Sequence, residues 1–437
     1  KTAPGFSEGL PVSLQNVKAV VLAAGKGVRM KSERPKVLHE VLGRPVLDFV
    51  LRNLRLAGVR DIVVVVGHGA EKVKAAAPGC RFAEQKEQKG TGHAVLSAAP
   101  ELEKFTGDVF VVAGDAPLIG PETLGRLLED HRAQKRAATF LSACLEDPTG
   151  YGRVVRDESS GRFLRFVEEV DATPQQRNIP ECNSGTYVFH APALLQALRE
   201  VKPNNKKGEV YLTDALGVLV SQGKPVEGMR SLQPLEIYGI NSRRDLVAAT
   251  NFIRWKILEY HMDNGVSVVD PSTTFIEEDV TIGQDTIVQP FTVIRRGVVI
   301  GKGCEVGPFT QLRAGTVLDD GAEVGNFVEV KKTHIGAHSK AKHLSYLGDA
   351  TLGARVNIGA GTITANYDGV KKHATVIEDE VHIGSNTVLV APVRMGRGSR
   401  TGAGAVVVGG EIPAGATMVG VPARPLAKAS KAKRKRA

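Results

Sequence analysis

The sequence predicts two folds in succession, an α/β domain with a mostly parallel sheet and then an all-β parallel solenoid. Three observations support this prediction. At 437 residues the chain exceeds the usual size of a single hydrophobic core. Apolar, β-rich runs alternate with helical patterns from residue 18 to about residue 225. Beyond residue 265 an aliphatic side chain recurs at every sixth position, which is typical of a parallel β-helix.

The alternating runs define the α/β part. In order they are KAVVLAAG, PVLDFVLRNLRLAG, DIVVVVG, GHAVLSAAPELEKF and DVFVVAGD. Strand and helix patterns in this order predict βαβ units with helices on both faces of the sheet. Ligands bind such sheets at the carboxyl ends of the strands. We expect the site near residues 20–36 (VVLAAGKGVRMKSERPK) and near Asp115, which follow two of these strands.

Residues 243–262 have the periodicity of an amphipathic helix, with Leu246, Ala249, Ile253 and Ile257 on one face. This segment lies between the two predicted folds. We therefore predict a linker helix.

The solenoid repeats without interruption over nine positions. The recurring aliphatic residues are Ile282, Val288, Ile294, Ile300, Val306, Leu312, Leu318, Val324 and Val330. The residue two positions before each of them is small or β-branched, and before Val306 it is Cys304. Six residues form one flat side, three sides close one coil, and the aliphatic side chains line the axis.

The six-residue period then slips. The step is five residues from Val330 to Ile335 and from Leu347 to Leu352, and seven from Val370 to Ile377. Irregular steps in a solenoid predict loops or bulges, which often mark functional sites.

Composition indicates a cytoplasmic protein without a membrane span. Hydrophobic residues make up 42% of the chain, but no apolar run reaches about 18 residues, and the N-terminus lacks the apolar segment of a signal peptide. The four cysteines are far apart and have no metal-ligand or redox spacing. Free thiols of this kind are typical of a reducing compartment.

The net charge of +10 is concentrated in part at the end of the chain. The tail KASKAKRKRA has six cationic side chains, and without them the charge is +4. We interpret the tail as a solvated end, and nucleic acid is not an expected partner.

The Gly-rich turn in residues 20–36 allows two interpretations. Backbone N–H groups of such a turn can approach phosphate oxygens, with Arg29 and Lys36 offsetting the charge. The alternative is a tight turn with solvated basic side chains.

Nine motifs occur in the order seen in sugar-1-phosphate nucleotidyltransferases: LAAGKGVRM, PKVLHEVLGRPVLDFV, QKEQKGTGHAV, AGDAPLI, GYGRVV, FVEE, CNSGTYVF, GEVYLTD and GINSRRDL. With its solenoid motifs, nearly the whole chain resembles the bifunctional N-acetylglucosamine-1-phosphate uridylyltransferase/glucosamine-1-phosphate N-acetyltransferases of bacterial UDP-N-acetylglucosamine synthesis. The resemblance implies a Rossmann-like (GT-A-like) nucleotidyltransferase domain, a left-handed parallel β-helix and a homotrimer. It implies UTP, acetyl-CoA, glucosamine-1-phosphate and N-acetylglucosamine-1-phosphate as substrates, with Mg²⁺ as cofactor.

The predicted organisation has five segments. They are an N-terminal extension (1–17), the uridylyltransferase domain (18–241), a linker helix (242–264), the β-helix acetyltransferase domain (265–424) and the basic tail (425–437).

The resemblance assigns the uridylyltransferase residues by position. Arg29 and Lys36 are the catalytic cations, and Asp115 with Asn241 holds the metal. The nucleotide-binding positions are Leu22, Ala23, Gly25, Lys36, Gln85, Gln88, Gly90 and Thr91. The sugar-binding positions are Gly152, Glu168, Asn183 and Thr213.

The slips in the solenoid coincide with VEVKKTHIGAHSKAKHLSYLGD and NIGAGTITANYDGVKKHATVI, which match the acetyltransferase segments of the family. Acetyl transfer to an amine needs a base, and histidine suits this role near neutral pH. The resemblance makes His343 the base. The substrate-binding positions are Arg313, Lys331, Tyr346, Asn357, Asn366, Tyr367 and Lys372.

Acetyl-CoA is assigned to later coils, at Ala360, Ser385 and Ala403. The chain departs from the family at Gly420, where an arginine for the CoA phosphate is common. Arg424 is the candidate replacement.

Two other functions fit parts of the sequence. A monofunctional nucleotidyltransferase with a structural or regulatory solenoid would need only the first domain, but His343, Lys331 and Asn366 argue against it. A non-enzymatic scaffold would not need Arg29, Lys36 and Asp115. A zinc site is disfavoured because the spacings of the solenoid histidines do not form a compact ligand set; these are His334, His338, His373 and His382.

Overall fold

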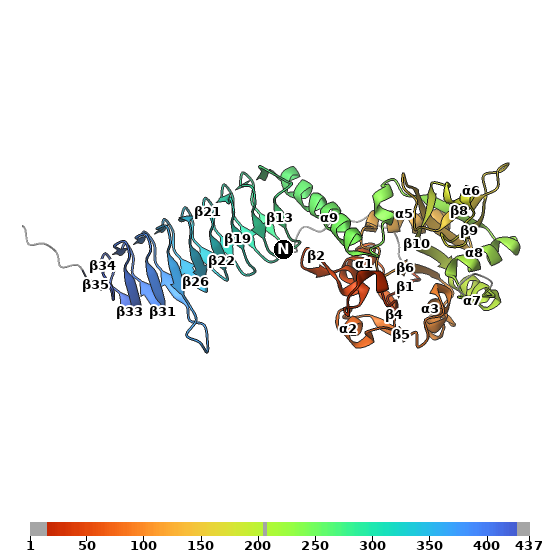
Figure 1. The fold of residues 1–437 in the computed structure, drawn as a ribbon, viewed down its shortest axis with the longest axis horizontal. Coiled ribbons are helices and arrows are strands. Elements are labelled where there is room, and N and C mark those ends of the chain that lie inside the picture. The colour runs from red at the N-terminus through yellow and green to blue at the C-terminus, as the bar shows by residue number, and fades with distance from the viewer. Residues whose placement is uncertain (1–14, 204–207, 426–437) are drawn as a thin grey trace, which may run out of the picture. The chain divides into compact units, whose positions relative to one another are not determined.

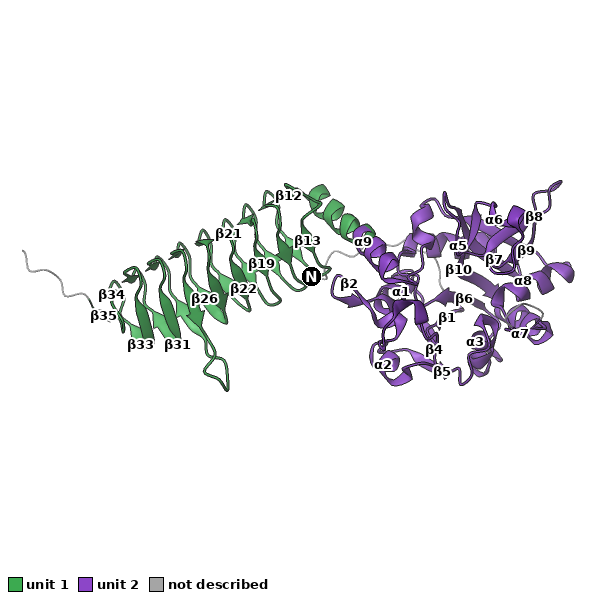
Figure 2. Ribbon diagram, in the orientation of Figure 1, with its two compact units in different colours: residues 1–6, 252–437 green, residues 7–251 purple. Residues whose placement is uncertain are grey.

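The computed structural model describes residues 15–203 and 208–425, which form two compact units (Figure 2). The first unit along the chain, purple in Figure 2, continues to Asn251, and the second, green in Figure 2, begins at Phe252, so the division falls inside helix α9 (Arg243–Asp263). Most of the predicted N-terminal extension and nearly all of the basic tail lie outside the described residues.

The first unit is built on one mixed sheet in which seven strands follow the order β11-β7-β10-β6-β1-β4-β5 (Figure 1). The strands are β1 (Val17–Leu22), β4 (Asp61–Val66), β5 (Arg81–Glu84), β6 (Asp108–Ala113), β7 (Ala138–Cys144), β10 (Glu181–His190) and β11 (Val226–Arg230). Strand β1 pairs in parallel with β4 on one side and β6 on the other, and β10 is antiparallel to β6 and β7. The carboxyl ends of β1 and β6 therefore form a topological switch point, where open α/β sheets bind ligands.

Alternate residues of the central strands enter two separate cores. In β1, Ala19 and Val21 belong to one core, while Val20 belongs to the other. Leucines of α1 and α5 fill the first core, and leucines of α7 and α8 fill the second. Both faces of the sheet are therefore covered by helices, and the α/β prediction is confirmed.

The remaining elements connect these layers. The helices are α1 (Val46–Leu56), α2 (Ala70–Ala75), α3 (Thr91–Ser97), α4 (Ala99–Leu102), α5 (Pro121–Ala133), α6 (Pro174–Arg177), α7 (Ala191–Glu200) and α8 (Leu212–Ser221). The short strands are β2 (Glu40–Val41), β3 (Arg44–Pro45), β8 (Arg153–Arg156) and β9 (Phe163–Val167). Among the described residues no helix is long and apolar enough to cross a bilayer.

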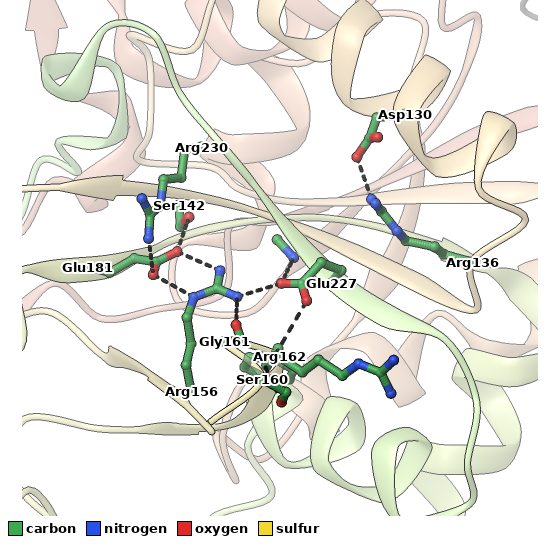
Figure 3. A network of polar contacts seen from close by, with 12 residues as sticks. Asp130, Arg136, Ser142, Arg156, Ser160, Gly161, Arg162, Glu181, Glu227 and Arg230 are labelled. Atoms are coloured by element: carbon green, nitrogen blue, oxygen red, sulfur yellow. Dashed lines mark hydrogen bonds and ion pairs between the residues drawn. The ribbon is translucent and has the colours of Figure 1, made fainter. Parts of the chain in front are cut away.

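An ion-pair network around the buried Glu181 carboxylate joins four strands at one side of the sheet (Figure 3). Arg156 donates to both carboxylate oxygens of Glu181, at 2.8 and 2.9 Å, and to Glu227 at 2.7 Å. Glu181 also accepts hydrogen bonds from Ser142 at 2.8 Å and Arg230 at 3.1 Å. The network fixes the start of β10, two residues before Asn183.

Burial alone would raise the pKa of Glu181, but the hydrogen bonds from Arg156, Arg230 and Ser142 outweigh it and lower the pKa to about 2. Because the folded pKa is below the ordinary value, ionised Glu181 stabilises the fold above that value, and the contribution is lost as the pH falls toward 2. We expect Glu181→Gln to reduce the free energy of unfolding near pH 7 by about 3 kcal/mol.

Urea titrations followed by the helical circular dichroism signal would measure this difference. It should shrink steadily between about pH 4.5 and pH 2. Glu129→Gln, at an exposed position of α5, is the matched control and should change stability by less than about 0.5 kcal/mol. A pH-independent difference would contradict the assignment.

The second unit is a three-sided parallel β-helix in which each strand from β12 to β28 pairs with the strand three places later. The first face contains β12 (Ser267–Val268), β15 (Ile287–Val288), β18 (Glu305–Val306), β21 (Glu323–Asn326), β24 (Lys340–His343), β27 (Asn357–Ile358), β30 (His382–Ile383), β32 (Arg400–Thr401), β34 (Thr417–Val419) and β35 (Arg424–Pro425). The second face contains β13 (Phe275–Ile276), β16 (Val293–Ile294), β19 (Gln311–Leu312), β22 (Glu329–Lys331), β25 (Tyr346–Gly348), β28 (Ile363–Ala365) and β31 (Val388–Met395). The third contains β14 (Thr281–Ile282), β17 (Val299–Ile300), β20 (Val317–Leu318), β23 (His334–Ile335), β26 (Ala350–Leu352) and β29 (Thr375–Ile377), and β33 (Val406–Ile412) pairs with β31.

The six-residue repeat corresponds to one side of a three-sided coil, as predicted. Ile287 pairs with Glu305, 18 residues later, so one coil consists of three six-residue sides. All nine recurring aliphatic residues are buried, and Ile282 is the most exposed of them at 8%. Buried threonine hydroxyls, such as that of Thr286, donate to backbone carbonyls of the next coil. The handedness of the coils stays a prediction from the resemblance.

The two kinds of slip have different structural outcomes. At the five-residue steps the coil shortens, so that Val317 pairs with His334, and a corner is tightened without an extruded loop. At the later slip Ala350 pairs with Thr375, 25 residues on. The extra residues form the loop between β28 and β29 that projects from the β-helix in Figure 1. The expected loop is confirmed there alone.

Candidate active sites

The Gly-rich turn after β1 packs against the segment that contains Lys36. In place of a helix, two 3-10 turns follow, Val28–Met30 and Lys36–Leu38. Gly27 has a φ of 62°, and a Cβ atom there would lie 2.6 Å from the Cβ of Lys36. Only glycine allows both this left-handed conformation and this approach without strain.

Lys36, Asp115, Asn241 and Arg29 converge from three distant segments. The Lys36 ammonium forms an ion pair with Asp115 and donates to Asn241 Oδ1 at 3.2 Å. Arg29 Nη2 donates to the same Oδ1 at 2.8 Å. Side chains of Lys36 and Asp115 are only 18% and 17% exposed. The structure thus brings together both predicted catalytic cations and both predicted metal ligands.

The start of α9 fixes Asn241. The Asp245 carboxylate accepts from the backbone N–H groups of Asn241 and Ser242 at 2.9 and 2.8 Å, and Ser242 Oγ accepts from Asp245 N at 3.3 Å. This reciprocal pattern is a helix-capping arrangement. In addition, Ile240 N donates to the Asp115 carbonyl at 2.8 Å. Helix capping therefore holds one candidate ligand beside the other.

A pocket of about 420 Å³, termed the nucleotide pocket, opens at the switch point of the sheet. All eight predicted nucleotide-binding residues and Asp115 line it. It is completed by residues that sequence reasoning did not identify: Ala24, Val37, Ala94, Ala113, Glu209 and Tyr211. Glu209 and Tyr211 belong to the quoted motif GEVYLTD, which was a usable signal.

Three polar side chains of this pocket have fixed roles as donors. Gln88 Nε2 donates to the Ala24 carbonyl at 2.7 Å, and buried Gln85 donates to the Gly90 carbonyl at 3.1 Å. Burial raises the pKa of Tyr211 to about 12, so its phenol stays protonated and can donate to a ligand.

The four sugar-binding candidates form a second cluster. Thr213 Oγ1 donates to Glu168 at 3.4 Å, and Asn183 N donates to the Gly152 carbonyl at 2.9 Å. A Cβ atom on Gly152 would lie 3.4 Å from the Glu168 carboxylate. The hydrogen bond from Leu212 N to Thr91 Oγ1, at 3.0 Å, joins this cluster to the nucleotide pocket.

Asp115 and Asn241 are suited to a hard cation. Among the described residues no group of three or more His, Cys, Asp and Glu side chains is arranged to hold a metal. A metal beside Lys36 would therefore have two protein oxygens and would complete its shell with water and phosphate. Mg²⁺ prefers this donor set.

His343 ends β24 on the outside of the β-helix, and its side chain is exposed. Its carbonyl accepts hydrogen bonds from Ser345 Oγ at 2.8 Å and from Gly361 N at 3.4 Å. These bonds fix the corner between the first and second faces and leave the imidazole accessible to a substrate.

The predicted phosphate-binding cations gather at the opposite corner of the second face. Arg313 pairs with Glu329 at 2.7 Å. The ammonium groups of Lys331 and Lys372 adjoin, and the contact with Lys372 lowers the pKa of Lys331. Like charges held together in this way favour an anionic ligand.

Two further substrate candidates lie beside these cations. Asn366 donates to Asp349, and a Cβ atom on Gly348 would lie 2.8 Å from the Asn366 amide nitrogen and even closer to the Tyr346 hydroxyl. Tyr367, on the projecting loop, forms an isolated bridge with Lys372. Asn357 lies apart from this group, on the first face beside Lys340.

A single chain does not gather all of these residues. His343 precedes strand β25 of the second face, whereas Lys331 ends strand β22 and Asn366 follows β28 on the far edge of that face. Only Tyr346, in β25, lies between the two edges.

The acetyl-CoA candidates lie on later coils at the same corner of the β-helix as His343. Asn386 N donates to the Ala360 carbonyl at 2.7 Å, and Gly404 N donates to the Ser385 carbonyl at 2.8 Å, so these residues and Ala403 stack on successive coils. Arg424 lies on the last coil, paired with Val419, and is exposed.

Comparisons with known proteins cover both units. Residues 19–214 match the family model of the MobA-like NTP transferase domain. The "Bifunctional protein GlmU" of Syntrophomonas wolfei is 45% identical over 430 residues, covering 90% of this chain and 94% of the relative. The proteins of the same name from Desulfitobacterium hafniense and Geobacillus thermodenitrificans are both 43% identical, over 89% and 92% of this chain and 93% and 95% of their own lengths.

Proposed function

The chain belongs to the bifunctional GlmU family of uridylyltransferase and acetyltransferase enzymes, and we propose that each of its two units performs one step of UDP-N-acetylglucosamine synthesis. The β-helix transfers an acetyl group from acetyl-CoA to glucosamine-1-phosphate. The α/β unit then transfers uridylyl from UTP to N-acetylglucosamine-1-phosphate and releases pyrophosphate. The observation that supports this most directly is the convergence of Lys36, Asp115 and Asn241 beside the nucleotide pocket.

Uridylyl transfer depends on position and charge. An oxygen of the sugar phosphate attacks the α-phosphorus of UTP, and the bond to pyrophosphate breaks on the opposite side. Lys36 and Arg29 would neutralise the phosphate charge that accumulates in this step. Asp115 and Asn241 would hold Mg²⁺, which supplies further charge neutralisation when bound.

Uracil carries no charge, so it must be recognised by shape and hydrogen bonds. The Gln85 and Gln88 amides are held by backbone carbonyls in a fixed orientation and can pair with the edge of the base. The neighbouring cluster of Gly152, Glu168, Asn183 and Thr213 is placed to bind the sugar hydroxyls and the N-acetyl group.

Acetyl transfer requires a neutral amine. The amine nitrogen attacks the thioester carbonyl, the C–S bond breaks, and His343 would accept the amine proton. Arg313, Lys331 and Lys372 would bind the sugar phosphate through charge-assisted hydrogen bonds.

A ladder of exposed phenylalanines supports the proposed homotrimer. Phe291, Phe309 and Phe327 stack on successive coils, with ring centroids 4.7 and 5.0 Å apart, and each side chain is at least 46% exposed. Their φ angles of 57°, 54° and 57° are left-handed, which costs about 1–2 kcal/mol for each residue. A turn alone would favour glycine, so these rings are explained better by a second copy of the chain that covers them.

Leu344, directly after His343, occupies the next position of this corner, since its N–H bonds to the Asn326 carbonyl one coil earlier. A neighbouring subunit on the ladder would therefore also adjoin His343. This accounts for the separation of the acetyltransferase residues within one chain.

Replacing Phe309 and Phe327 together by serine should convert the trimer to monomers in size-exclusion chromatography with light scattering. Acetyl transfer should fall at least about tenfold, while uridylyl transfer is retained. Val299→Ser, at a residue of the third face that is 44% exposed, is the control and should stay trimeric. A monomeric wild-type protein would refute the assembly.

One assay tests the function as a whole. The purified protein is incubated with glucosamine-1-phosphate, acetyl-CoA, UTP and Mg²⁺, one reactant is omitted at a time, and products are identified by mass. We expect N-acetylglucosamine-1-phosphate without UTP and UDP-N-acetylglucosamine with all reactants. Uridylyl transfer to supplied N-acetylglucosamine-1-phosphate without any acetylated product would instead indicate a monofunctional nucleotidyltransferase.

A further inference from the structure

A second pocket in the α/β unit, termed the basic pocket, lies at the opposite end of the sheet strands from the nucleotide pocket. Its volume is about 490 Å³. It is lined by Asp108, which starts β6, and by His190, which ends the antiparallel β10. Asp115 follows the other end of β6, so about 20 Å of strand separates the two pockets. The basic pocket therefore takes no part in the reaction proposed above.

Cationic side chains dominate its lining. Arg132, Lys135, Arg136 and Lys224 line the pocket with a single carboxylate, that of Asp108. Asp108 accepts a hydrogen bond from Arg132 Nε at 2.6 Å. With this pair neutralised, the pocket wall retains an excess of positive charge.

The two lysines have no carboxylate partner among the described residues. Lys224 Nζ donates to the neutral amide of Gln196 at 3.3 Å. Lys135 is exposed and makes no side-chain hydrogen bond or ion pair in the part of the chain that the structure describes. Arg136, by contrast, pairs with Asp130 outside the pocket (Figure 3).

A purely structural role explains only part of this arrangement. Arg132 and Lys135 lie at the carboxyl end of α5, where cations interact favourably with the helix dipole. Lys224 belongs to the connection between α8 and β11 and has no such reason to face the same cavity. Lys135 also has a φ of 48°, at a position after a helix where glycine is usual.

We propose that the basic pocket binds a small phosphate-bearing anion with at least two negative charges. Phosphate oxygens accept charge-assisted hydrogen bonds from ammonium and guanidinium groups together, and their negative charge offsets the cations, which a neutral ligand would not do. The volume exceeds that of a phosphate group alone and is in the range of pockets for small organic ligands. Lys135 and Lys224 are the principal contacts from two separate elements.

The test uses the full-length protein with inorganic pyrophosphate as the probe and hydrogen exchange as a local readout. Pyrophosphate should protect segments 131–137 and 222–226. Because pyrophosphate can also enter the nucleotide pocket, the measurement is repeated in Lys36→Ala, where protection of these two segments should persist.

The double variant Lys135→Gln/Lys224→Gln should weaken this binding at least about tenfold and retain uridylyl transfer within about twofold. Lys72→Gln, at an exposed lysine of α2, is the matched control and should bind as the wild type does. Added salt should also weaken binding, because the contacts are between charges.

Two results would overturn the proposal. Protection confined to segments 22–37 and 85–91 would place the only pyrophosphate in the nucleotide pocket. An oligonucleotide that displaced pyrophosphate from segments 131–137 and 222–226 at lower concentration would replace a small anion with a nucleic acid as ligand.

Discussion

Asp115→Ala should lower uridylyl transfer about 10³-fold while acetyl transfer stays within about twofold of the wild type. The carboxylate pairs with Lys36 and would supply the charged ligand for Mg²⁺, so its removal should misplace a cation and weaken metal binding. Asp115 belongs to the α/β unit, and His343 belongs to the β-helix unit. Acetyl transfer is therefore an internal control for variants of Asp115, and uridylyl transfer is an internal control for variants of His343.

Pyrophosphate release from UTP and N-acetylglucosamine-1-phosphate measures this effect, with and without Mg²⁺. Chelation of the metal should abolish uridylyl transfer and leave acetyl transfer unchanged. Asp61→Asn is the matched control, because Asp61 lies at the start of the neighbouring strand β4 and contacts neither Lys36 nor Asn241. More than about one tenth of wild-type activity in Asp115→Ala would contradict its assignment as the metal carboxylate.

His343→Ala should lower acetyl transfer to glucosamine-1-phosphate by 10²-fold to about 10⁴-fold, the usual contribution of a general base. The side chain is exposed and its replacement removes no packing, so the fold and uridylyl transfer should be retained.

Thiol release from acetyl-CoA measures the loss. His334→Ala is the matched control, since His334 is also exposed but pairs with Asp319 at 2.9 Å on the third face. Equal loss of both activities in His343→Ala would indicate misfolding, and retained acetyl transfer would identify another base.

The sequence predicted the β-helix nearly completely, because every coil repeats the same environments. An inward position such as Val306 has one neighbour above and one below, so a six-residue period is sufficient to identify it. The spacing between successive inward residues also predicted the loop between β28 and β29. It did not predict the tightened corners, because a missing corner residue and an added loop both appear as an irregular step.

Features built from distant residues were harder to predict. Nothing local in the sequence connects Lys224 with Lys135, because the sheet topology alone brings α5 and the start of β11 together. Tyr211 belongs to the motif GEVYLTD, but its place in the nucleotide pocket depends on the fold. The phenylalanine ladder has a signal in the sequence, one ring at every eighteenth residue, but the six-residue aliphatic period does not include these positions.

The sequence predicts a site at the switch point of the sheet for a physical reason. Strand alternation fixes which ends of β1 and β6 meet, and the Gly-rich turn can only lie there. The convergence of Asn241 with Asp115 could not follow from the sequence in the same way, because it depends on how α9 begins 126 residues later.

In the three-sided coil, the number of residues inserted or deleted decides which face every later side chain occupies. Because 18 residues complete one circuit, inserting or deleting that number before residue 324 returns every later side chain to its original face. A change of six residues between Phe309 and residue 324 would turn all later side chains by about a third of a revolution, and His343 would then point along a different side of the prism from Phe291 and Phe309. Evolution can therefore lengthen or shorten this unit in whole circuits without altering its chemistry.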